Sequence, residues 1–126
     1  MRINVYTDGA CSNNGRANAK AGLGIYFGDG DPRNSSERII GKQTNNTAEL
    51  TAILRAAAIL QEEIMDGYEI HIYTDSDYAK RCCTTYGEKL EKKGWNVGSK
   101  KPIPNLELVQ KAYTVFKQLD NVHFHY

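Results

Sequence analysis

The chain has 126 residues, 40% of them hydrophobic and 25% charged, and a formal net charge of +1 at neutral pH. This length and composition favour one globular domain and exclude a disordered chain. The near-neutral charge excludes a globally basic protein, so any affinity for nucleic acid has to come from local clusters of charge.

Three strands are predicted in the first third of the chain. Residues 3–7 alternate apolar and polar side chains and end at Asp8 and Gly9, which predicts a strand followed by a turn. Further strands are predicted over residues 21–27 and 37–43, separated by a segment rich in Gly, Asp and Pro. Because the links are short, we expect an antiparallel meander.

A long helix is predicted over residues 47–64, which are rich in Ala and Leu. Its apolar side chains recur at helical spacing and form one stripe of Ile53, Ala56, Ala57, Leu60 and Ile64. A fourth strand is predicted over residues 68–74. Since a helical crossover joins the third strand to the fourth, these two strands are expected to run parallel.

The last third of the chain begins with a helix over residues 77–90, interrupted at Gly87, and a basic loop over residues 92–101. Pro104 is typical of a helix start. The helix that it opens has one apolar face, made of Leu106, Val109, Tyr113, Phe116 and Leu119.

A fifth strand is predicted over residues 122–126. The elements together predict the α/β class, with a mixed five-stranded sheet flanked by helices. Its first three strands form the meander, and the fourth and fifth run parallel to the first. We expect one domain over residues 1–126, because no linker or low-complexity segment divides the chain.

Two predicted strands end in the same way. Residues 3–8 read Ile-Asn-Val-Tyr-Thr-Asp, and residues 70–75 read Ile-His-Ile-Tyr-Thr-Asp. If these strands are parallel neighbours in register, Asp8 and Asp75 lie side by side at the edge where open α/β sheets bind ligands. Carboxylates so close repel each other unless a cation lies between them. The alternative is that each aspartate only begins a turn, which explains either residue alone better than the matched pair.

Glu49 is the third candidate carboxylate. Residues 46–49 read Asn-Thr-Ala-Glu, so a capping box at the helix start is one interpretation. However, Glu49 shares a helix face with Ile53, Ala56 and Leu60, and that face has to bury against the sheet. A buried carboxylate needs a partner, and a metal ion shared with the aspartates would supply one. The two roles do not exclude each other.

Three carboxylates suit a hard divalent cation such as Mg²⁺ or Mn²⁺. Such ions polarise a phosphoryl oxygen and activate water. The residues alone therefore predict a metal site for hydrolysis of a nucleic-acid backbone, with Asp8, Glu49 and Asp75 as ligands.

The cysteines indicate where the protein resides. There are three, with Cys82 next to Cys83, and this odd count excludes a secreted disulfide framework. No signal peptide and no apolar run of membrane-spanning length is present in the sequence. We therefore expect an intracellular protein, in the cytoplasm or the nucleus, that does not interact with a membrane.

With these residues in place, the chain resembles a type 1 ribonuclease H. The resemblance rests on short segments in the family's order, at residues 6–15, 21–26, 44–50, 73–76, 92–95 and 102–105. The first three read Tyr-Thr-Asp-Gly-Ala-Cys-Ser-Asn-Asn-Gly, Ala-Gly-Leu-Gly-Ile-Tyr and Thr-Asn-Asn-Thr-Ala-Glu-Leu. The others read Tyr-Thr-Asp-Ser, Lys-Lys-Gly-Trp and Pro-Ile-Pro-Asn. Each segment is modest alone, but the ordered set is specific.

The resemblance implies endonucleolytic cleavage of the RNA strand in an RNA–DNA hybrid by a two-metal mechanism. It assigns Asp8, Glu49 and Asp75 as the catalytic metal ligands, with Mg²⁺ or Mn²⁺ as the cofactor and two ions in the complete enzyme. Two alternatives stay open. One is a domain that binds hybrid or metal with little turnover, and the other is a DNA-directed nuclease of the same fold.

The resemblance also implies contacts to the substrate. It matches Cys11, Asn14, Asn45 and Asn46 to positions that contact ribose 2′-hydroxyls, the groups that separate RNA from DNA. Many relatives have Gln where this chain has Asn46, a shorter amide. From the residues alone, the segment around Asn14 is equally well explained as a turn.

A pocket for a phosphate of the DNA strand is implied for Thr44, Asn105 and Lys42. From the residues alone, Asn105 after Pro104 is also typical of a helix N-cap.

A basic stretch over residues 80–101 contains seven Lys or Arg residues against two Glu. It resembles the family's basic protrusion, which implies that Lys89, Lys92 and Lys93 grip the hybrid; the alternative is a solvated charged loop. Tyr86 stands where relatives often have a Trp against a DNA sugar, and Leu90 replaces a second aromatic.

Four further aromatic residues are expected to be structural. Trp95, beside a glycine, is predicted to belong to the local core. His71, His123 and His125 alternate with apolar residues, so they are predicted to lie on strand faces rather than to bind a metal.

The family pattern continues beyond Tyr126 with a loop that carries a His and a helix that carries a fourth carboxylate. The resemblance therefore implies a domain that lacks both parts. Because that helix would cover part of the sheet, we expect lower stability or self-association with a second copy.

Overall fold

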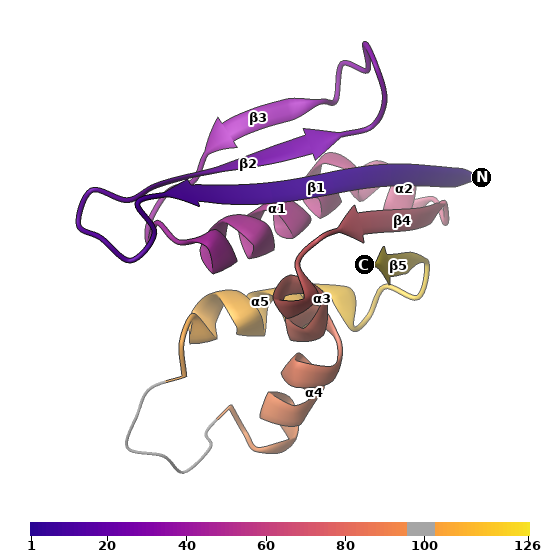
Figure 1. Cartoon of the computed structure of the whole chain (residues 1–126). Helices are drawn as coiled ribbons and strands as arrows, with labels where there is room; N and C mark the ends of the chain where they lie inside the picture. The colour runs from indigo at the N-terminus through magenta and orange to yellow at the C-terminus, as the bar shows by residue number, and fades with distance from the viewer. Residues whose placement is uncertain (96–102) are drawn as a thin grey trace.

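A five-stranded sheet forms the centre of the computed structural model, which describes residues 1–95 and 103–126. The strands lie side by side in the order β3-β2-β1-β4-β5 (Figure 1). They are β1 (Arg2–Ser12), β2 (Lys20–Tyr26), β3 (Ser35–Arg38), β4 (Glu69–Thr74) and β5 (Val122–His125). β1 to β3 pair antiparallel, whereas β4 pairs parallel with β1 and β5 parallel with β4. The predicted fold class and sheet topology are therefore confirmed.

In the described part of the chain, five helices accompany the sheet: α1 (Asn45–Ile59), α2 (Gln61–Met65), α3 (Asp77–Cys83), α4 (Thr85–Lys92) and α5 (Leu106–Phe116). α1 packs along β1 and β2, and α3, α4 and α5 pack together next to β4 (Figure 1). No helix in the described part of the chain is long and apolar enough to cross a membrane.

β1 is longer than predicted, because the chain does not turn at Asp8. Asp8 pairs with Gly24, and the pairing with β2 continues to Ser12 opposite Lys20. The turn follows instead at residues 13–18, where Asn13 adopts a positive φ of 54°. The interpretation of Asp8 as a residue that only begins a turn is therefore wrong.

β3 is shorter than predicted and ends at Arg38. Beyond Arg38, the side chain of Gln43 bonds to the backbone. Its Oε1 accepts from the backbone N–H of Ala21, and its Nε2 donates to the carbonyls of Ile39 and Gly41. Gly41 also has a φ of 92°, outside the strand region. Residues 39–43 therefore form a loop tied to β2.

The predicted long helix is divided at Leu60 into α1 and α2. α1 begins at Asn45, earlier than expected, because Thr44 is its N-cap. The hydroxyl of Thr44 accepts from the backbone N–H of Thr47 at 3.0 Å, and the Thr47 hydroxyl accepts from the N–H of Thr44. The predicted apolar stripe is buried along its whole length: Ile53, Ala56, Ala57, Leu60 and Ile64.

The predicted interruption at Gly87 is wrong. The break between α3 and α4 falls at Thr84, and Gly87 is helical and buried inside α4. A Cβ at Gly87 would collide with the carbonyl oxygen of Cys82 and the ring of Tyr113. The glycine therefore allows α4 to pack closely against α3 and α5.

α5 begins at Leu106, two residues after Pro104, and buries Val109, Tyr113 and Phe116 as predicted. Trp95 packs edge-on against Tyr113 at 6.0 Å between ring centroids, in agreement with its predicted place in the local core. Most of the predicted basic loop, including Lys100 and Lys101, lies outside the described residues.

The two faces of the sheet differ. Val5, Ile70 and Ile72 face α1 and form the core. On the opposite face, rings follow one another across β1, β4 and β5, with neighbouring centroids 4.7–5.0 Å apart; they belong to Tyr6, Tyr73, His125, His71 and His123. The three histidines thus lie on strand faces, as predicted.

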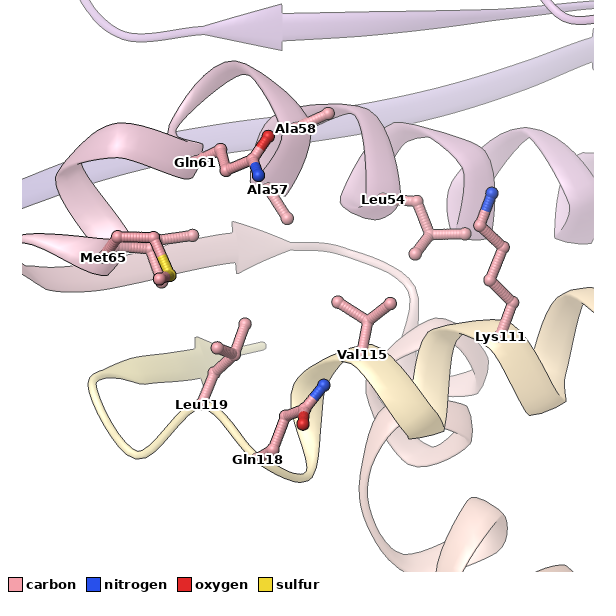
Figure 2. Close-up of a pocket in the computed structure, with 10 residues that line it drawn as sticks. Leu54, Ala57, Ala58, Gln61, Met65, Lys111, Val115, Gln118 and Leu119 are labelled. Atoms are coloured by element: carbon pink, nitrogen blue, oxygen red, sulfur yellow. The ribbon is translucent and has the colours of Figure 1, made fainter.

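An apolar groove lies between the α1–α2 segment and α5. It encloses about 330 Å³ and is lined by residues that include Leu54, Ala57, Met65, Val115 and Leu119 (Figure 2). None of the candidate site residues predicted from the sequence lines this groove.

Candidate metal centre

The parallel pairing of β1 and β4 brings two aspartates together. Ile3 lies opposite Ile70, and the register continues to Thr7 opposite Thr74. Asp8 and Asp75 are the next residues: Asp75 directly follows β4, whereas Asp8 lies within β1, which continues to Ser12, and both aspartates are exposed. The matched Tyr-Thr-Asp segments therefore lie side by side, as the sequence predicted, although only the second of them ends its strand.

Glu49 comes to the same place from α1. Asp8, Glu49 and Asp75 each offer a carboxylate oxygen, and these three oxygens lie within 4.8 Å of one another. The capping box that was the alternative role for Glu49 is formed instead by Thr44 and Thr47. Glu49 is therefore free of helix capping, and its carboxylate contacts β1 at Gly9 and the end of β4 at Thr74.

The Glu49 carboxylate is buried, with 7% of its surface exposed. Its Oε1 accepts from the backbone N–H of Gly9 at 2.9 Å, and its Oε2 accepts from the hydroxyl of Thr74 at 3.4 Å. Burial, with smaller contributions from the charges of Asp75 and Asp8, raises the pKa of Glu49 to about 7. The two hydrogen bonds act in the opposite direction and lower this pKa, but they do not outweigh burial. Among residues 1–95 and 103–126, no ion pair offers this carboxylate a countercharge.

This donor set fits a hard divalent cation. The site offers only carboxylate oxygens, which are the ligands that Mg²⁺ and Mn²⁺ prefer. A cation between the three groups would offset their mutual repulsion and supply the countercharge that Glu49 lacks. The structure therefore has a group of acidic residues that could hold a metal ion.

Gly9 makes the approach of α1 to β1 possible. A Cβ at this position would lie 2.5 Å from the backbone carbon of Ala48 and 2.5 Å from the backbone nitrogen of Glu49. Only glycine allows the strand to pass so close to the first turns of the helix. Gly9 therefore sets the distance between Asp8 on β1 and Glu49 on α1.

The residues expected to contact ribose lie near the start of α1. Asn14, in the turn after β1, accepts a hydrogen bond from the backbone N–H of Asn45 at 3.1 Å. The thiol of Cys11 lies 3.5 Å from the carbonyl oxygen of Gln43. Asn45 and Asn46 are exposed. The turn interpretation of Asn14 is correct, since Asn14 lies in the turn after β1, and this turn carries its side chain to α1.

The residues predicted to bind a phosphate of the DNA strand lie on two segments, one before α1 and one before α5. Thr44 caps α1, and Lys42 is exposed in the loop before it. Asn105 precedes α5 with a positive φ of 58°, but its side chain makes no capping bond and lies 3.4 Å from the hydroxyl of Tyr78. Within residues 1–95 and 103–126, no hydrogen bond joins Asn105 to Thr44 or Lys42.

The basic residues of α4 share one face. Lys89, Lys92 and Lys93 line a shallow hollow of about 350 Å³, together with Thr85 and Glu88. Lys92 forms an ion pair with Glu88 at 3.1 Å, which leaves most of its side chain exposed. Tyr86 is half-buried against the core.

Two residues at this centre were not predicted from the sequence. Gly9 was interpreted as a turn residue, although its place directly after Asp8 was a usable signal. Thr74 belongs to the repeated Tyr-Thr-Asp segment, yet no contact to Glu49 was expected for it. Both contacts join positions far apart in the chain, so periodicity along the sequence could not indicate them.

Comparison with known proteins gives matches over the whole chain. The family model described as RNase H matches residues 1–126. Ribonuclease H1 of Mus musculus is 40% identical over 103 residues, which cover 82% of this chain and 35% of the mouse protein. The chain thus spans about a third of that relative's length. Ribonuclease H of a Wolbachia species is 36% identical over 123 residues, covering 95% of this chain and 73% of that protein.

Solved structures show the same fold. The RNase H domain of PFV superposes with a TM-score of 0.71 at 19% identity, over 98% of this chain and 77% of that one. LC11-RNase H1, in complex with an RNA/DNA hybrid, superposes with a TM-score of 0.56 at 27% identity, over 98% of this chain and 83% of that one. The chain belongs to the RNase H family.

Proposed function

We propose that the protein is an endonuclease that hydrolyses the RNA strand of RNA–DNA hybrids and requires a divalent metal ion. The observation that carries the proposal is the convergence of three carboxylate oxygens within 4.8 Å beside the carboxyl end of β4. Membership of the RNase H family and the hybrid bound to LC11-RNase H1 support this substrate.

Asp8, Glu49 and Asp75 would hold the metal ion, which we propose to be Mg²⁺ or Mn²⁺. When bound, such an ion polarises the scissile phosphate and lowers the pKa of a water molecule. The three side chains contribute position and charge: two come from neighbouring strands in register, and the third is held by hydrogen bonds from Gly9 and Thr74. Rigid placement of this kind is a main source of catalytic rate.

Selection for RNA would come from groups at the start of α1. Asn14 and Asn45 are joined by a hydrogen bond, and Cys11 and Asn46 lie on the segments that flank them. Their amide and thiol groups can exchange hydrogen bonds with ribose 2′-hydroxyls, which DNA lacks. Thr44, Lys42 and Asn105 would contact a phosphate of the DNA strand.

The lysines of α4 would hold the hybrid by charge. Lys89, Lys92 and Lys93 share one exposed face, so their positive charges act together on the phosphate backbone. Tyr86 on the same helix would contact the DNA strand. We also propose an intracellular location, supported by the free thiols of Cys11, Cys82 and Cys83.

A cleavage assay with each strand labelled in turn tests the proposal. We expect Mg²⁺- or Mn²⁺-dependent cleavage of the RNA strand of a hybrid, and none of a DNA duplex of the same sequence. Asp75→Asn should abolish cleavage, whereas Asp77→Asn should retain it, because Asp77 is exposed and pairs with Arg81 at 3.6 Å. Cleavage undiminished by excess chelator contradicts the proposal.

Two other outcomes would identify the alternatives. Salt-sensitive binding of the hybrid without any product would indicate a binding domain. Preferential cleavage of an all-DNA substrate would indicate a DNA-directed nuclease of the same fold.

A further inference from the structure

Thr74 contacts the buried member of the carboxylate group. Its hydroxyl lies 3.4 Å from Oε2 of Glu49, while Oε1 of the same carboxylate accepts from Gly9 at 2.9 Å. The two oxygens of Glu49 are thus contacted from two neighbouring strands. Together these contacts define the rotation of the carboxylate about its last bond.

The hydroxyl of Thr74 accepts one hydrogen bond and donates another. Its Oγ1 accepts from the backbone N–H of Ser76 at 3.1 Å, and a hydroxyl has a single proton to donate. That proton is therefore available to Glu49. Ser76 is itself fixed, because its side chain caps α3 by accepting from Ala79 at 3.1 Å. A chain of bonds thus runs from α3 through Thr74 to Glu49 on α1.

Thr7 provides a comparison within the same sheet. It is the register partner of Thr74 on β1, is equally buried at 5% exposure, and also precedes an aspartate of the site. Its hydroxyl, however, has no hydrogen-bond partner among the residues that the structure describes. The two threonines share residue type, strand position and burial, and they differ in the contact to Glu49.

We infer that Thr74 is a positioning residue, whose hydroxyl orients the Glu49 carboxylate for a divalent cation. The inference rests on the proposed function for the role of that cation. Partners of this kind, which hold a metal ligand from behind, commonly change metal affinity 10- to 100-fold when removed. Thr7 has no such role, although its sequence context is the same.

The test measures Mn²⁺ binding to the protein alone by calorimetry, in the absence of nucleic acid. Thr74→Val keeps the shape of the side chain and removes the hydroxyl, and it should weaken Mn²⁺ binding about tenfold. Thr74→Ser keeps the hydroxyl and should bind within about twofold of the unchanged protein. Thr7→Val is the matched control and should bind Mn²⁺ as the unchanged protein does.

Circular dichroism establishes that each variant is folded. If Thr74→Val fails to fold, Thr74→Ala takes its place, because it also removes the hydroxyl but puts no methyl group where the hydroxyl was. Equal Mn²⁺ affinity of Thr74→Val or Thr74→Ala and the unchanged protein overturns the inference. So does an equal loss in Thr7→Val, a loss in Thr74→Ser as large as that in Thr74→Val, or the absence of any Mn²⁺ binding to the unchanged protein.

The result can be separated from the fate of the proposed function. If Thr74→Val loses Mn²⁺ affinity but the unchanged protein cleaves no hybrid, the positioning role stands and the proposed activity fails. If the unchanged protein cleaves hybrid with metal and Thr74→Val binds Mn²⁺ normally, the activity stands and the positioning role fails.

Discussion

The backbone N–H of Gly9 donates to the carboxylate of Glu49 over 2.9 Å. This bond joins the strand that carries Asp8 to the helix that carries Glu49, at the point where a Cβ on Gly9 would lie 2.5 Å from the helix backbone. The geometry of the candidate metal centre therefore depends on a residue without a side chain.

Gly9→Ala is expected to destabilise the protein by about 1–3 kcal/mol, because the added methyl group meets backbone atoms of Ala48 and Glu49 that cannot rotate away. The rate of hybrid cleavage should fall by more than the loss of folded protein explains, because the added methyl group moves α1, and with it Glu49, away from β1. Urea unfolding and the cleavage assay measure the two effects.

Gly24→Ala is the matched control for that change. Gly24 is the register partner of Asp8 on β2, and a Cβ there would have no neighbour within 4 Å. The free energy of unfolding of the Gly24→Ala variant should stay within about 0.5 kcal/mol of that of the unchanged protein. A Gly9→Ala variant as stable and active as Gly24→Ala would contradict the role assigned to the close approach.

The raised pKa of Glu49 predicts a pH dependence of stability in the absence of metal. Its pKa is about 7 in the folded state, against 4.5 ordinarily. Between these values the unfolded chain has released the proton and the folded state keeps it, so the free energy of unfolding falls as pH rises. Below this window neither state is ionised, and above it the loss is complete.

Glu49→Gln should remove this loss. In chelator at pH 8 the variant is expected to be more stable than the unchanged protein by roughly 1–3 kcal/mol, and near pH 4 the two should be alike. Urea unfolding over this range measures the difference, with Glu107→Gln on exposed α5 surface as control. A difference that stays constant with pH would show that burial of Glu49 is not responsible.

Thr44→Ala should cost about 1 kcal/mol of stability, because the hydroxyl of Thr44 caps α1 by accepting from Thr47. Thr44→Ser retains that hydroxyl and should lose far less. Thermal unfolding distinguishes them, and equal loss in both variants would mean that the methyl group, not the cap, stabilises the helix start.

Replacing Lys89, Lys92 and Lys93 together by Gln should weaken hybrid binding and make it less sensitive to salt. For every lysine that neutralises a phosphate, its replacement should reduce the slope of log K against log salt concentration by about one. Fluorescence anisotropy at several salt concentrations measures both effects. Lys111→Gln, in the groove of Figure 2, is the control and should leave the slope unchanged.

Much of the fold could be predicted from the order of the residues. Strands were predicted close to β1, β2, β4 and β5, the first from its alternating apolar side chains, and a stripe at helical spacing identified the buried face of α1. The repeated Tyr-Thr-Asp ending predicted that Asp8 and Asp75 lie together, which the register of β1 and β4 confirms. These features are local or periodic, so the sequence displays them directly.

Element ends were predicted less well, since they depend on contacts between distant residues. β3 ends early because the side chain of Gln43 bonds to Ala21, and α4 continues through Gly87 because its neighbours leave no room for a side chain. In each case a tertiary contact overrode the local tendency of glycine or of a β-forming run.

The sequence by itself determined the chemistry of this protein: three carboxylates, two of them in matched Tyr-Thr-Asp segments. Only the tertiary structure decided how that chemistry is held. Thr7 and Thr74 share the same Tyr-Thr-Asp context, yet within the described part of the chain the Thr7 hydroxyl has no partner and the Thr74 hydroxyl lies against Glu49. The reason is physical, because a hydrogen bond needs its partners within about 3.5 Å, and folding alone brings α1 to the end of β4.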